Sequence, residues 1–485
     1  MRGVDRDKWN DFVDVASYIV SYGGTVDAEY LDVRVVEHFD MRISVNNGRP
    51  VSIERGHDIG LGVRVFNKGV QAIASLNNPS KSLADDLVIS LINRVKRLLS
   101  LKGIDKFSLH DVPSEEVEYE VGEEKPFMDY YEEVLEVLKD VDKSIRDSEK
   151  IELVNRSFMV FYTLERKLFL SSDQVSINSS IPRIIFFGSI VGKNGGFATK
   201  NILLGSAEGA EFINYDFLVE EVSKRVLAME KVLTEAKAVP TDKYDIIVGP
   251  EITGIIAHEA VGHPFEFDRV MGMEGAQAGE SYLSKDSIGR RIGSSEVTVV
   301  DNPQYKVSYG YYKYDDDGIE AGNRILIKDG VVNSFLTNRF SASRFGLESN
   351  GSSRASTYKD EPIVRMGITY FQEGHMSLEE LIEEVGRGIL IRDFTEWNID
   401  DRRINQRYTG FEAYLISNGR LGPPVKYPVI ESTTMEILSN IVGRSNKVEL
   451  FPGFCGKGDP MQVMPVSMGG PYLLIKDIPI SSRST

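Results

Sequence analysis

The chain has 485 residues, more than one ordinary hydrophobic core holds, so two or three domains are expected. Its 41% hydrophobic and 27% charged residues are typical of a soluble globular protein, and no run approaches the roughly 18 apolar residues of a membrane-spanning helix. The net charge of −17, without a basic cluster, argues against nucleic acid as a partner. Acidic residues interrupt the apolar patch at the N-terminus, which argues against a signal peptide and favours a cytoplasmic, membrane-free location.

The first half of the chain alternates between helical and strand periodicity, which predicts an α+β fold. Residues 1–113 form a predicted N-terminal α+β domain, with helices at about 6–23 and 80–101 around antiparallel strands. The strand turns are placed at Asn47-Gly48 and Arg55-Gly56. Residues 114–238 form a middle helix-and-strand segment, which we expect to contain an exposed acidic connector (114–125), an amphipathic helix after Pro126, strands (about 150–205) and a second helix (about 215–237).

The remaining part, residues 239–485, is predicted to be a large β-rich C-terminal domain. Short apolar runs separated by Gly, Asn and Asp turns fill it, with one helix near 377–388. Its first distinctive stretch is IIAHEAVGHPFEFD at 255–268, which contains His258, Glu259 and His263. Two histidines and a glutamate in six positions suggest a metal site, although histidines at this distance can also be ordinary buried or surface residues.

The spacing of the two histidines sets a geometric condition on that metal site. On a straight helix, residues five apart point about 140° away from each other and cannot share an ion. Two local structures would bring them together. The helix could end at Gly262 and release His263 before Pro264, or a single wide turn of π type could place both rings on one face.

Cys455 is the third candidate ligand. It is the only cysteine, so the chain cannot form an intramolecular disulfide. The glycines at 453 and 456 allow its backbone to approach another element closely, and two histidines with one thiolate form a reasonable zinc site with an open position. The alternative is an inert buried cysteine. Glu259 would then be the general base that takes a proton from the attacking water, its alternative being an exposed helix residue.

With these motifs in view, the sequence resembles the TldD/PmbA family of zinc metallopeptidases, specifically its TldD-type catalytic members. The resemblance covers nearly the whole chain. It rests on segments in a fixed order: HEAVGH at 258–263, DDDGIEAGNRILIKDGVV at 315–332, NGSSRASTYKDEPIVRMGITYFQEG at 350–374, FEAYLISNGRLGPPVK at 411–426 and CGKGDPMQVMPVSMGGP at 455–471. The GDPMQ portion of the cysteine loop departs from the shorter spacing expected for the family.

The resemblance implies an HExxxH zinc site with His258, His263 and Cys455 as ligands and Glu259 as catalytic acid/base, with one Zn2+ per chain. It implies an N-terminal α+β region followed by a β-rich C-terminal metallopeptidase domain. It also implies a homodimer, or a heterodimer with a related non-catalytic TldE/PmbA-like subunit, acting on unfolded peptides or small proteins.

The alternative function is a zinc-containing protein-interaction or peptide-maturation subunit with little peptidase activity of its own. A structural zinc site usually has four protein ligands, and the sequence offers only three good ones, which favours catalysis. Hydrolysis of a non-peptide amide also remains open. Arg339, Arg354 and Tyr358 fall in family-like segments, where they could serve the reaction or the structure.

Overall fold

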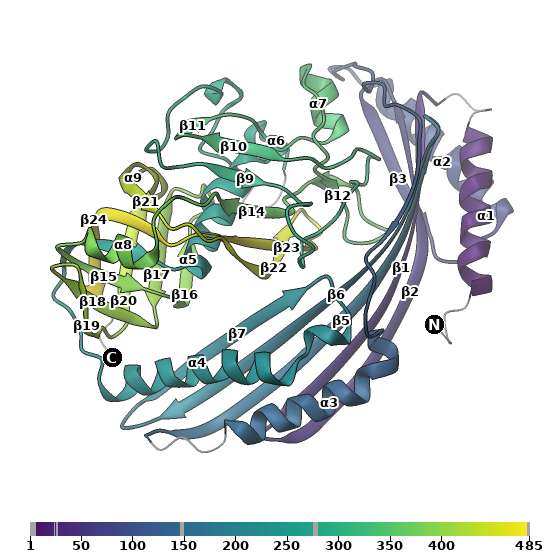
Figure 1. The fold of residues 1–485 in the computed structure, drawn as a ribbon. Helices are drawn as coiled ribbons and strands as arrows, with labels where there is room; N and C mark the ends of the chain where they lie inside the picture. The colour runs from purple at the N-terminus through teal and green to yellow at the C-terminus, as the bar shows by residue number, and fades with distance from the viewer. Residues whose placement is uncertain (1–5, 24, 26–27, 146–149, 275–279, 483–485) are drawn as a thin grey trace.

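The computed structural model describes residues 6–23, 25, 28–145, 150–274 and 280–482. The N-terminal part is built around one long curved sheet (Figure 1). Its strand order is β3-β2-β1-β5-β6-β4, with β7 also paired to β6, and the pairs are antiparallel except for β4 with β6. The strands are β1 (Tyr30–Asn46), β2 (Arg49–Asn67), β3 (Val70–Leu76), β4 (Glu115–Glu120), β5 (Glu152–Ser171), β6 (Val175–Lys193) and β7 (Phe197–Ser206).

Hairpin turns set the register of this sheet. Asn47-Gly48 turns the chain from β1 to β2 with positive φ at both residues, as predicted, and this backbone geometry suits the twist of the two strands. The turn predicted at Arg55-Gly56 is wrong, because β2 runs through both residues and pairs Gly56 with Asp40. A glycine in a strand need not turn the chain, and here it leaves room beside Asp40.

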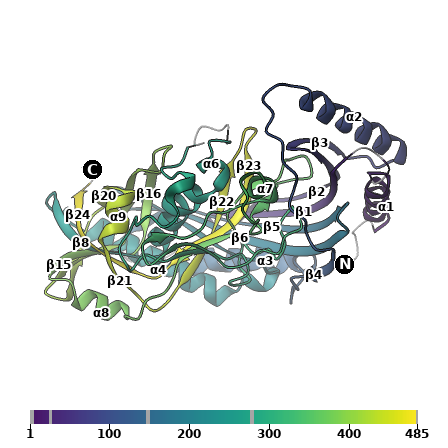
Figure 2. The same cartoon turned by 90° about the horizontal axis from the view of Figure 1, so that it is seen from above.

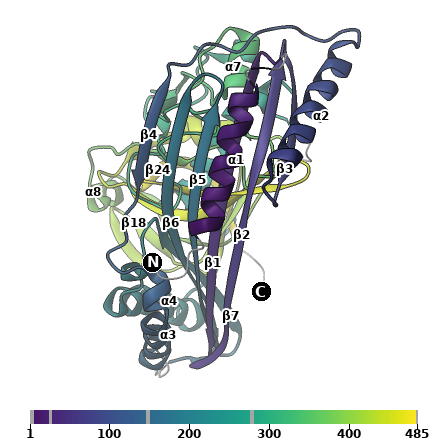
Figure 3. The same ribbon diagram turned by 90° about the vertical axis from the view of Figure 1, so that its right-hand side faces the viewer.

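Four helices pack against the outer face of the curved sheet (Figures 1 and 3). The predicted helix at 6–23 and the one near 80–101 are confirmed, and both cover apolar side chains of β1, β2 and β3. The predicted helices after Pro126 and near 215–237 are also confirmed, and they cover the opposite end of the same face. The helices are α1 (Arg6–Gly23), α2 (Lys81–Leu99), α3 (Phe127–Ser144) and α4 (Tyr215–Thr234).

The acidic stretch at 114–125 contains an edge strand, so its prediction as a mere connector is wrong. Residues 115–120 form β4 and pair in parallel with β6. Val117 and Tyr119 alternate with exposed glutamates and pack against a small apolar cluster, so a period of two is present beneath the high charge. The strands before and after residue 113 thus share one sheet, and the three-part division at 113 and 238 stays a prediction about domains.

The C-terminal part contains two larger sheets and a two-stranded ladder of β12 with β13, and the predicted α+β class is confirmed. One sheet has the order β16-β17-β20-β24-β8-β15-β18-β19, with β21 also on β24, and the other has the order β11-β10-β9-β14-β23-β22. The strands are β8 (Asp242–Val248), β9 (Val299–Asp301), β10 (Arg324–Lys328), β11 (Val331–Val332), β12 (Ser353–Arg354), β13 (Ile363–Val364), β14 (Ile368–Phe371), β15 (Arg387–Ile391), β16 (Phe394–Ile399), β17 (Asn405–Gly410), β18 (Ala413–Ser417), β19 (Arg420–Pro424), β20 (Pro428–Thr433), β21 (Ile441–Arg444), β22 (Glu449–Lys457), β23 (Gln462–Gly470) and β24 (Leu473–Ser482).

Short helices connect these strands. The helix predicted near 377–388 is confirmed as the shorter α8, whereas α7 and α9 were not predicted because each is only two turns long. The α-helices are α5 (Pro250–Ile255), α6 (Phe267–Val270), α7 (Arg339–Phe345), α8 (Leu378–Glu383) and α9 (Thr434–Asn440). The described residues also form a π-helix and three short 3₁₀ turns (Ile256–Gly262; Ala210–Phe212, His263–Phe265 and Lys285–Ser287). Among the described residues, no helix has both the length and the apolar character of a membrane span.

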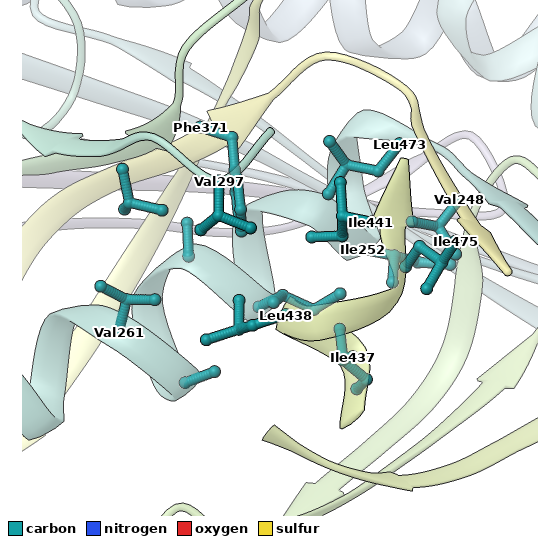
Figure 4. Packing of buried hydrophobic residues seen from close by; sticks show 14 of the residues in the cluster. Val248, Ile252, Val261, Val297, Phe371, Ile437, Leu438, Ile441, Leu473 and Ile475 are labelled. Carbon is teal, nitrogen blue, oxygen red and sulfur yellow. The ribbon is translucent and has the colours of Figure 1, made fainter. Parts of the chain in front are cut away.

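The main C-terminal core lies where the two sheets meet the helical segment that starts at Pro250 (Figure 4). Ile252 and Val261 of that segment pack in one cluster with Val248 of β8 and Leu473 of β24. The segment also lies directly against β23, because a Cβ added to Gly254 would be 2.9 Å from the backbone nitrogen of Gly469. The core thus fixes the helical segment between two sheets.

Buried ion pairs join the curved sheet to the C-terminal part, which lies beside it in both views (Figures 1 and 2). Arg64 of β2 bonds to Asp32 of β1 and, at 2.6 Å, to Asp317 of the DDDG segment. Lys167 of β5 lies 2.9 Å from Asp316 in the same segment. Removing one partner of a buried pair is costly, so these contacts hold the two parts in a fixed relation.

Candidate metal centre

The segment that carries the two histidines starts as an ordinary helix. After β8, Gly249 is extended and Pro250 occupies the first helical turn, where its missing N–H costs nothing. Glu251 lies in the same turn, near the positive end of the helix dipole. The chain then widens into the π-helix, which carries His258 and Glu259.

A π turn joins the two histidines directly. The main-chain N–H of His263 donates to the carbonyl of His258, which is the five-residue bond of a π turn. The two imidazole rings therefore lie on one side, with centroids 4.9 Å apart and planes at 81°. Of the two expected local structures, the wide turn is the one present.

The alternative in which His263 leaves helical geometry after Gly262 is wrong. Gly262 and His263 both keep right-handed helical angles, although His263 precedes a proline. Pro264 cannot donate to the carbonyl of Ala260 four residues earlier, and the hydroxyl of Tyr282 donates to that oxygen instead, at 2.7 Å. Gly262 is needed for space, since an added Cβ would be 1.9 Å from the sulfur of Met366.

The third predicted ligand comes from β22, the edge strand of the sheet that also contains β9, β14 and β23. Cys455 lies on β22, and its Sγ is 3.4 Å from Nε2 of His263. One ligand atom from each of His258, His263 and Cys455 lies within 4.8 Å of the others, and all three side chains are buried. The structure thus brings together residues that are nearly two hundred positions apart in the sequence.

A buried charge cluster fixes the orientation of His263. Its Nδ1 is 3.0 Å from Oε2 of Glu266, which leaves Nε2 facing Cys455. Burial alone would raise the pKa of Glu266, but the charges of Lys457 and His263 hold that pKa well below its ordinary value. A carboxylate on the second ring nitrogen is the usual support of a metal-binding histidine.

Lys457 ties the cysteine strand to the histidine segment. Its fully buried ammonium lies 2.7 Å from Asp268, 3.2 Å from Glu266 and 2.8 Å from the carbonyl of Val364. Arg365, also fully buried, donates to the main-chain carbonyl of Cys455 and, at 3.1 Å, to that of Gln462 across the hairpin. Together, the two cations fix the position of the thiol relative to the imidazoles.

For Cys455 and His258, the electrostatics favour the protonation states in which these two side chains bind metal. Burial opposes ionisation of the thiol, but His263 and Arg365 lower the pKa of Cys455 to about 7. Burial also lowers the pKa of His258, which favours neutral imidazole. Thiolate and neutral imidazole are the forms in which cysteine and histidine act as ligands.

Glu259 lies beside the three candidate ligands. It is buried, and its Oε2 is 3.0 Å from Nη1 of Arg403. Burial raises its pKa, but His263, His258 and Arg403 outweigh this and lower the pKa below the ordinary value. The carboxylate is therefore charged at neutral pH and able to accept a proton.

Sequence reasoning missed Glu266, Lys457, Arg365 and Arg403. Glu266 and Lys457 are three and two residues from His263 and Cys455, so a search of near neighbours for second-layer partners could have found them. Arg365 and Arg403 come from distant segments, and no local pattern marks them.

The other three residues of the family-like segments, Arg339, Arg354 and Tyr358, make contacts away from the candidate ligands. Arg339 donates to the carbonyl of His110 at 2.9 Å, and Tyr358 packs on Gly60 of β2. Arg354 donates to the carbonyls of Met366 and Pro465 and lies over the ring of Tyr312. Among the described residues, no hydrogen bond or ring contact joins any of these three side chains to His258, His263 or Cys455.

The donor set fits a zinc ion. Two nitrogens and one sulfur suit its tetrahedral preference and leave a fourth position open, and the separations need only a small contraction. The Nδ1 of His258 is buried without a hydrogen-bond partner, which a metal or a water would satisfy. Buried histidines with a cysteine and an adjacent carboxylate, on an α+β scaffold, define a candidate metal centre of the kind that metal-dependent hydrolases use.

Comparison with known proteins identifies the family. Residues 241–482 match the model of the PmbA/TldA metallopeptidase C-terminal domain, and residues 31–100 match that of PmbA/TldA metallopeptidase domain 1. A metalloprotease of Methanocaldococcus jannaschii is 30% identical over 448 residues, covering 91% of this chain and 95% of that protein. The chain belongs to the PmbA/TldD family of metallopeptidases.

A further relative agrees with this assignment, and two solved structures share the fold. A zinc metalloprotease TldD homologue of Saccharolobus solfataricus is 28% identical over 276 residues, covering 55% of this chain and 59% of that protein. TldE from Thermococcus kodakarensis has the same fold, with a TM-score of 0.72 at 17% identity over 96% of this chain and 100% of that one. A proposed DNA gyrase modulator from Thermotoga maritima also has this fold, with a TM-score of 0.77 at 16% sequence identity, covering 97% of this chain and 100% of that one.

Proposed function

We propose that this metallopeptidase is a zinc enzyme of the HExxxH type that hydrolyses peptide bonds of small or unfolded polypeptides. His258, His263 and Cys455 would hold one zinc ion per chain, and Glu259 would act as general base and acid. The observation that carries the proposal is the convergence of three buried donor atoms within 4.8 Å of one another, beside a buried carboxylate. The name of the Saccharolobus relative supports zinc as the metal.

The residues divide the chemical work between them. A zinc ion held here would act as a Lewis acid that activates water and polarises the substrate carbonyl. Glu259 would take a proton from the attacking water onto a carboxylate oxygen and return it to the nitrogen of the leaving amine. Glu266 would keep Nδ1 of His263 engaged, so that Nε2 stays directed at the ligand cluster.

An extended peptide would suit the position of the site. β22 carries Cys455 and is the last strand of its sheet, and neighbouring Phe454 is 53% exposed. A peptide added alongside such an edge binds by main-chain hydrogen bonds that ignore its side chains, as broad specificity requires. Cleavage that depends far more on substrate side chains than on free backbone amides would contradict this mode.

The assembly state belongs to the proposal as well. The fold shared with TldE supports either a homodimer or a heterodimer with a related, non-catalytic TldE/PmbA-like subunit. Sedimentation of the purified chain, alone and mixed with such a subunit, would distinguish these two assemblies from a monomer.

Metal analysis combined with two substitutions tests the function. Purified protein should hold about one zinc per chain. Glu259→Ala should keep the zinc and lose cleavage of an unfolded polypeptide, whereas Glu431→Ala, at an exposed position of β20, should keep both. Cys455→Ser should lose zinc. Retained cleavage in the Glu259 variant would refute the mechanism, and wild-type protein that binds zinc without cleaving would favour the interaction or maturation role.

A further inference from the structure

The turn between β16 and β17 delivers one more charged residue to the candidate site. Asp400 closes the turn, because its carboxylate accepts the main-chain N–H groups of Ile404 at 2.8 Å and Asn405 at 3.0 Å. Arg403 sits in this turn with a left-handed φ of 60°, and its carbonyl accepts the hydroxyl of Thr434. A non-glycine residue held at positive φ costs energy, and such positions cluster at functional sites.

The side chain of Arg403 reaches Glu259 but does not use its donors there. Nη1 lies 3.0 Å from Oε2 of Glu259, and the two side chains are only 13% and 10% exposed. The contact is not aligned as a hydrogen bond, since Oε2 of Glu259 and the buried Nε of Arg403 both have no hydrogen-bond partner among the described residues. A guanidinium offers five donors, so most of them remain available to another group.

The other cationic side chains around the site already bind carboxylates or main-chain carbonyls. Arg269 and Lys457 pair with Glu266 behind His263. Arg365 donates to the main-chain carbonyls of the β22–β23 hairpin. Within the described ranges, Arg403 is therefore the cation next to the candidate base that still has donors to give.

We propose that Arg403 is a catalytic residue that binds the carbonyl oxygen of the scissile peptide as it becomes an oxyanion. This inference rests on the proposed peptidase function. Water oxygen bonds to the carbonyl carbon while Glu259 accepts one water proton, and the carbonyl π pair moves onto oxygen. The guanidinium loses its counter-charge on Glu259 at the moment when a new negative charge forms within its reach, and it donates to that charge.

The second half of the reaction returns every group to its first state. The oxyanion pair re-forms the carbonyl double bond, the carbon–nitrogen bond breaks, and its electron pair stays on nitrogen. Glu259 gives its proton to that nitrogen, and the charged carboxylate pairs again with Arg403. The net change is one water added across one peptide bond, with no other reactant consumed.

Two substitutions and a neighbouring control test the role of Arg403. Arg403→Gln should lower kcat by about 100-fold or more, the usual effect of losing an oxyanion donor, with a much smaller change in KM. Arg403→Lys, which keeps the charge but loses the planar fork, should recover about tenfold of that loss. Arg402→Gln is the matched control, because Arg402 lies in the same turn with its side chain 65% exposed. Its kcat should stay within about twofold of wild type, like that of other surface variants.

Two further readouts separate oxyanion binding from a purely structural role. Zinc content should be unchanged in all three variants. A phosphonate analogue of the cleaved peptide copies the tetrahedral anion, so Arg403→Gln should raise its inhibition constant by about the factor by which kcat/KM falls. Wild-type-like kcat, or an unchanged inhibition constant with reduced kcat, would overturn the inference alone.

The remaining outcomes are also decisive. If Arg403→Gln does not fold, the lysine variant decides, and wild-type kcat in that variant overturns the inference. If wild-type protein shows no zinc-dependent cleavage, the proposed function fails and this inference falls with it.

Discussion

Replacing Glu266 by glutamine is expected to weaken zinc binding although it removes no ligand. The carboxylate accepts from Nδ1 of His263 at 3.0 Å and from Nε of Arg269 at 2.8 Å, and it lies 3.2 Å from Nζ of Lys457. Glutamine keeps the shape of the side chain but not the charge. The ring orientation of His263 and its basicity as a ligand would then have weaker support.

The size of the effect follows from what such second-layer contacts contribute. Loss of a carboxylate behind a metal-binding histidine typically costs about 10- to 100-fold in affinity. That range corresponds to about 1.4–2.7 kcal/mol of binding free energy. Zinc affinity measured by competition with a chromophoric chelator at neutral pH would resolve a change of this size.

Glu274→Gln is the matched control for this experiment. Glu274 is also buried and lies 3.0 Å from the same Arg269, but it has no contact with His263 among those described. Its substitution should change zinc affinity by less than about threefold, as expected for a residue without contact to a ligand. Equal losses in the two variants, or no loss in Glu266→Gln, would refute the role assigned to the Glu266 contact.

Three further predictions concern the surroundings of the same site. Gly262→Ala should destabilise the protein by about 1–3 kcal/mol through overpacking, seen as a lower thermal midpoint, whereas Gly386→Ala has open space and should not. Zinc binding should weaken about tenfold per pH unit below about 7, because the thiol of Cys455, whose pKa is about 7, must release its proton; a flat affinity from pH 5.5 to 8 would contradict this. Lys457→Met should cost about 3–5 kcal/mol by leaving buried carboxylates uncompensated, while Lys447→Met, 76% exposed, should leave the midpoint unchanged.

Periodicity in the sequence was sufficient for the long elements and failed for those governed by tertiary contacts. The amphipathic helix after Pro126 repeats its apolar residues at the helical period, so its place was predictable. The sequence of β4 resembles an acidic connector, because only Val117 and Tyr119 are inward-facing apolar residues. The strand forms through its pairing with β6, which the local sequence does not reveal. The Arg55-Gly56 pair resembles a turn, yet the pairing of Gly56 with Asp40 of β1 keeps β2 extended there.

The candidate site shows the same division. His258, Glu259 and His263 stand in one local motif, and the five-residue spacing already required either a broken helix or a wide turn. Local residues could not choose between the two, because contacts around the turn, such as the hydrogen bond from the hydroxyl of Tyr282 to the carbonyl of Ala260, come from residues outside the motif. Arg403 lies in the turn between β16 and β17 and reaches Glu259 from more than a hundred residues away in the sequence, so no local pattern could place it there.

The wide turn at the histidines also has a consequence for how related motifs are compared. In an ordinary α-helix the hydrogen bond spans four residues, and histidines four apart share a face. Here the hydrogen bond from His263 to His258 spans five residues, so the ring that this bond closes contains one residue more than a turn of α-helix. HExxxH in this chain is geometrically an HExxH helix with a single inserted residue. A shift of one position in an alignment would therefore pair non-equivalent side chains.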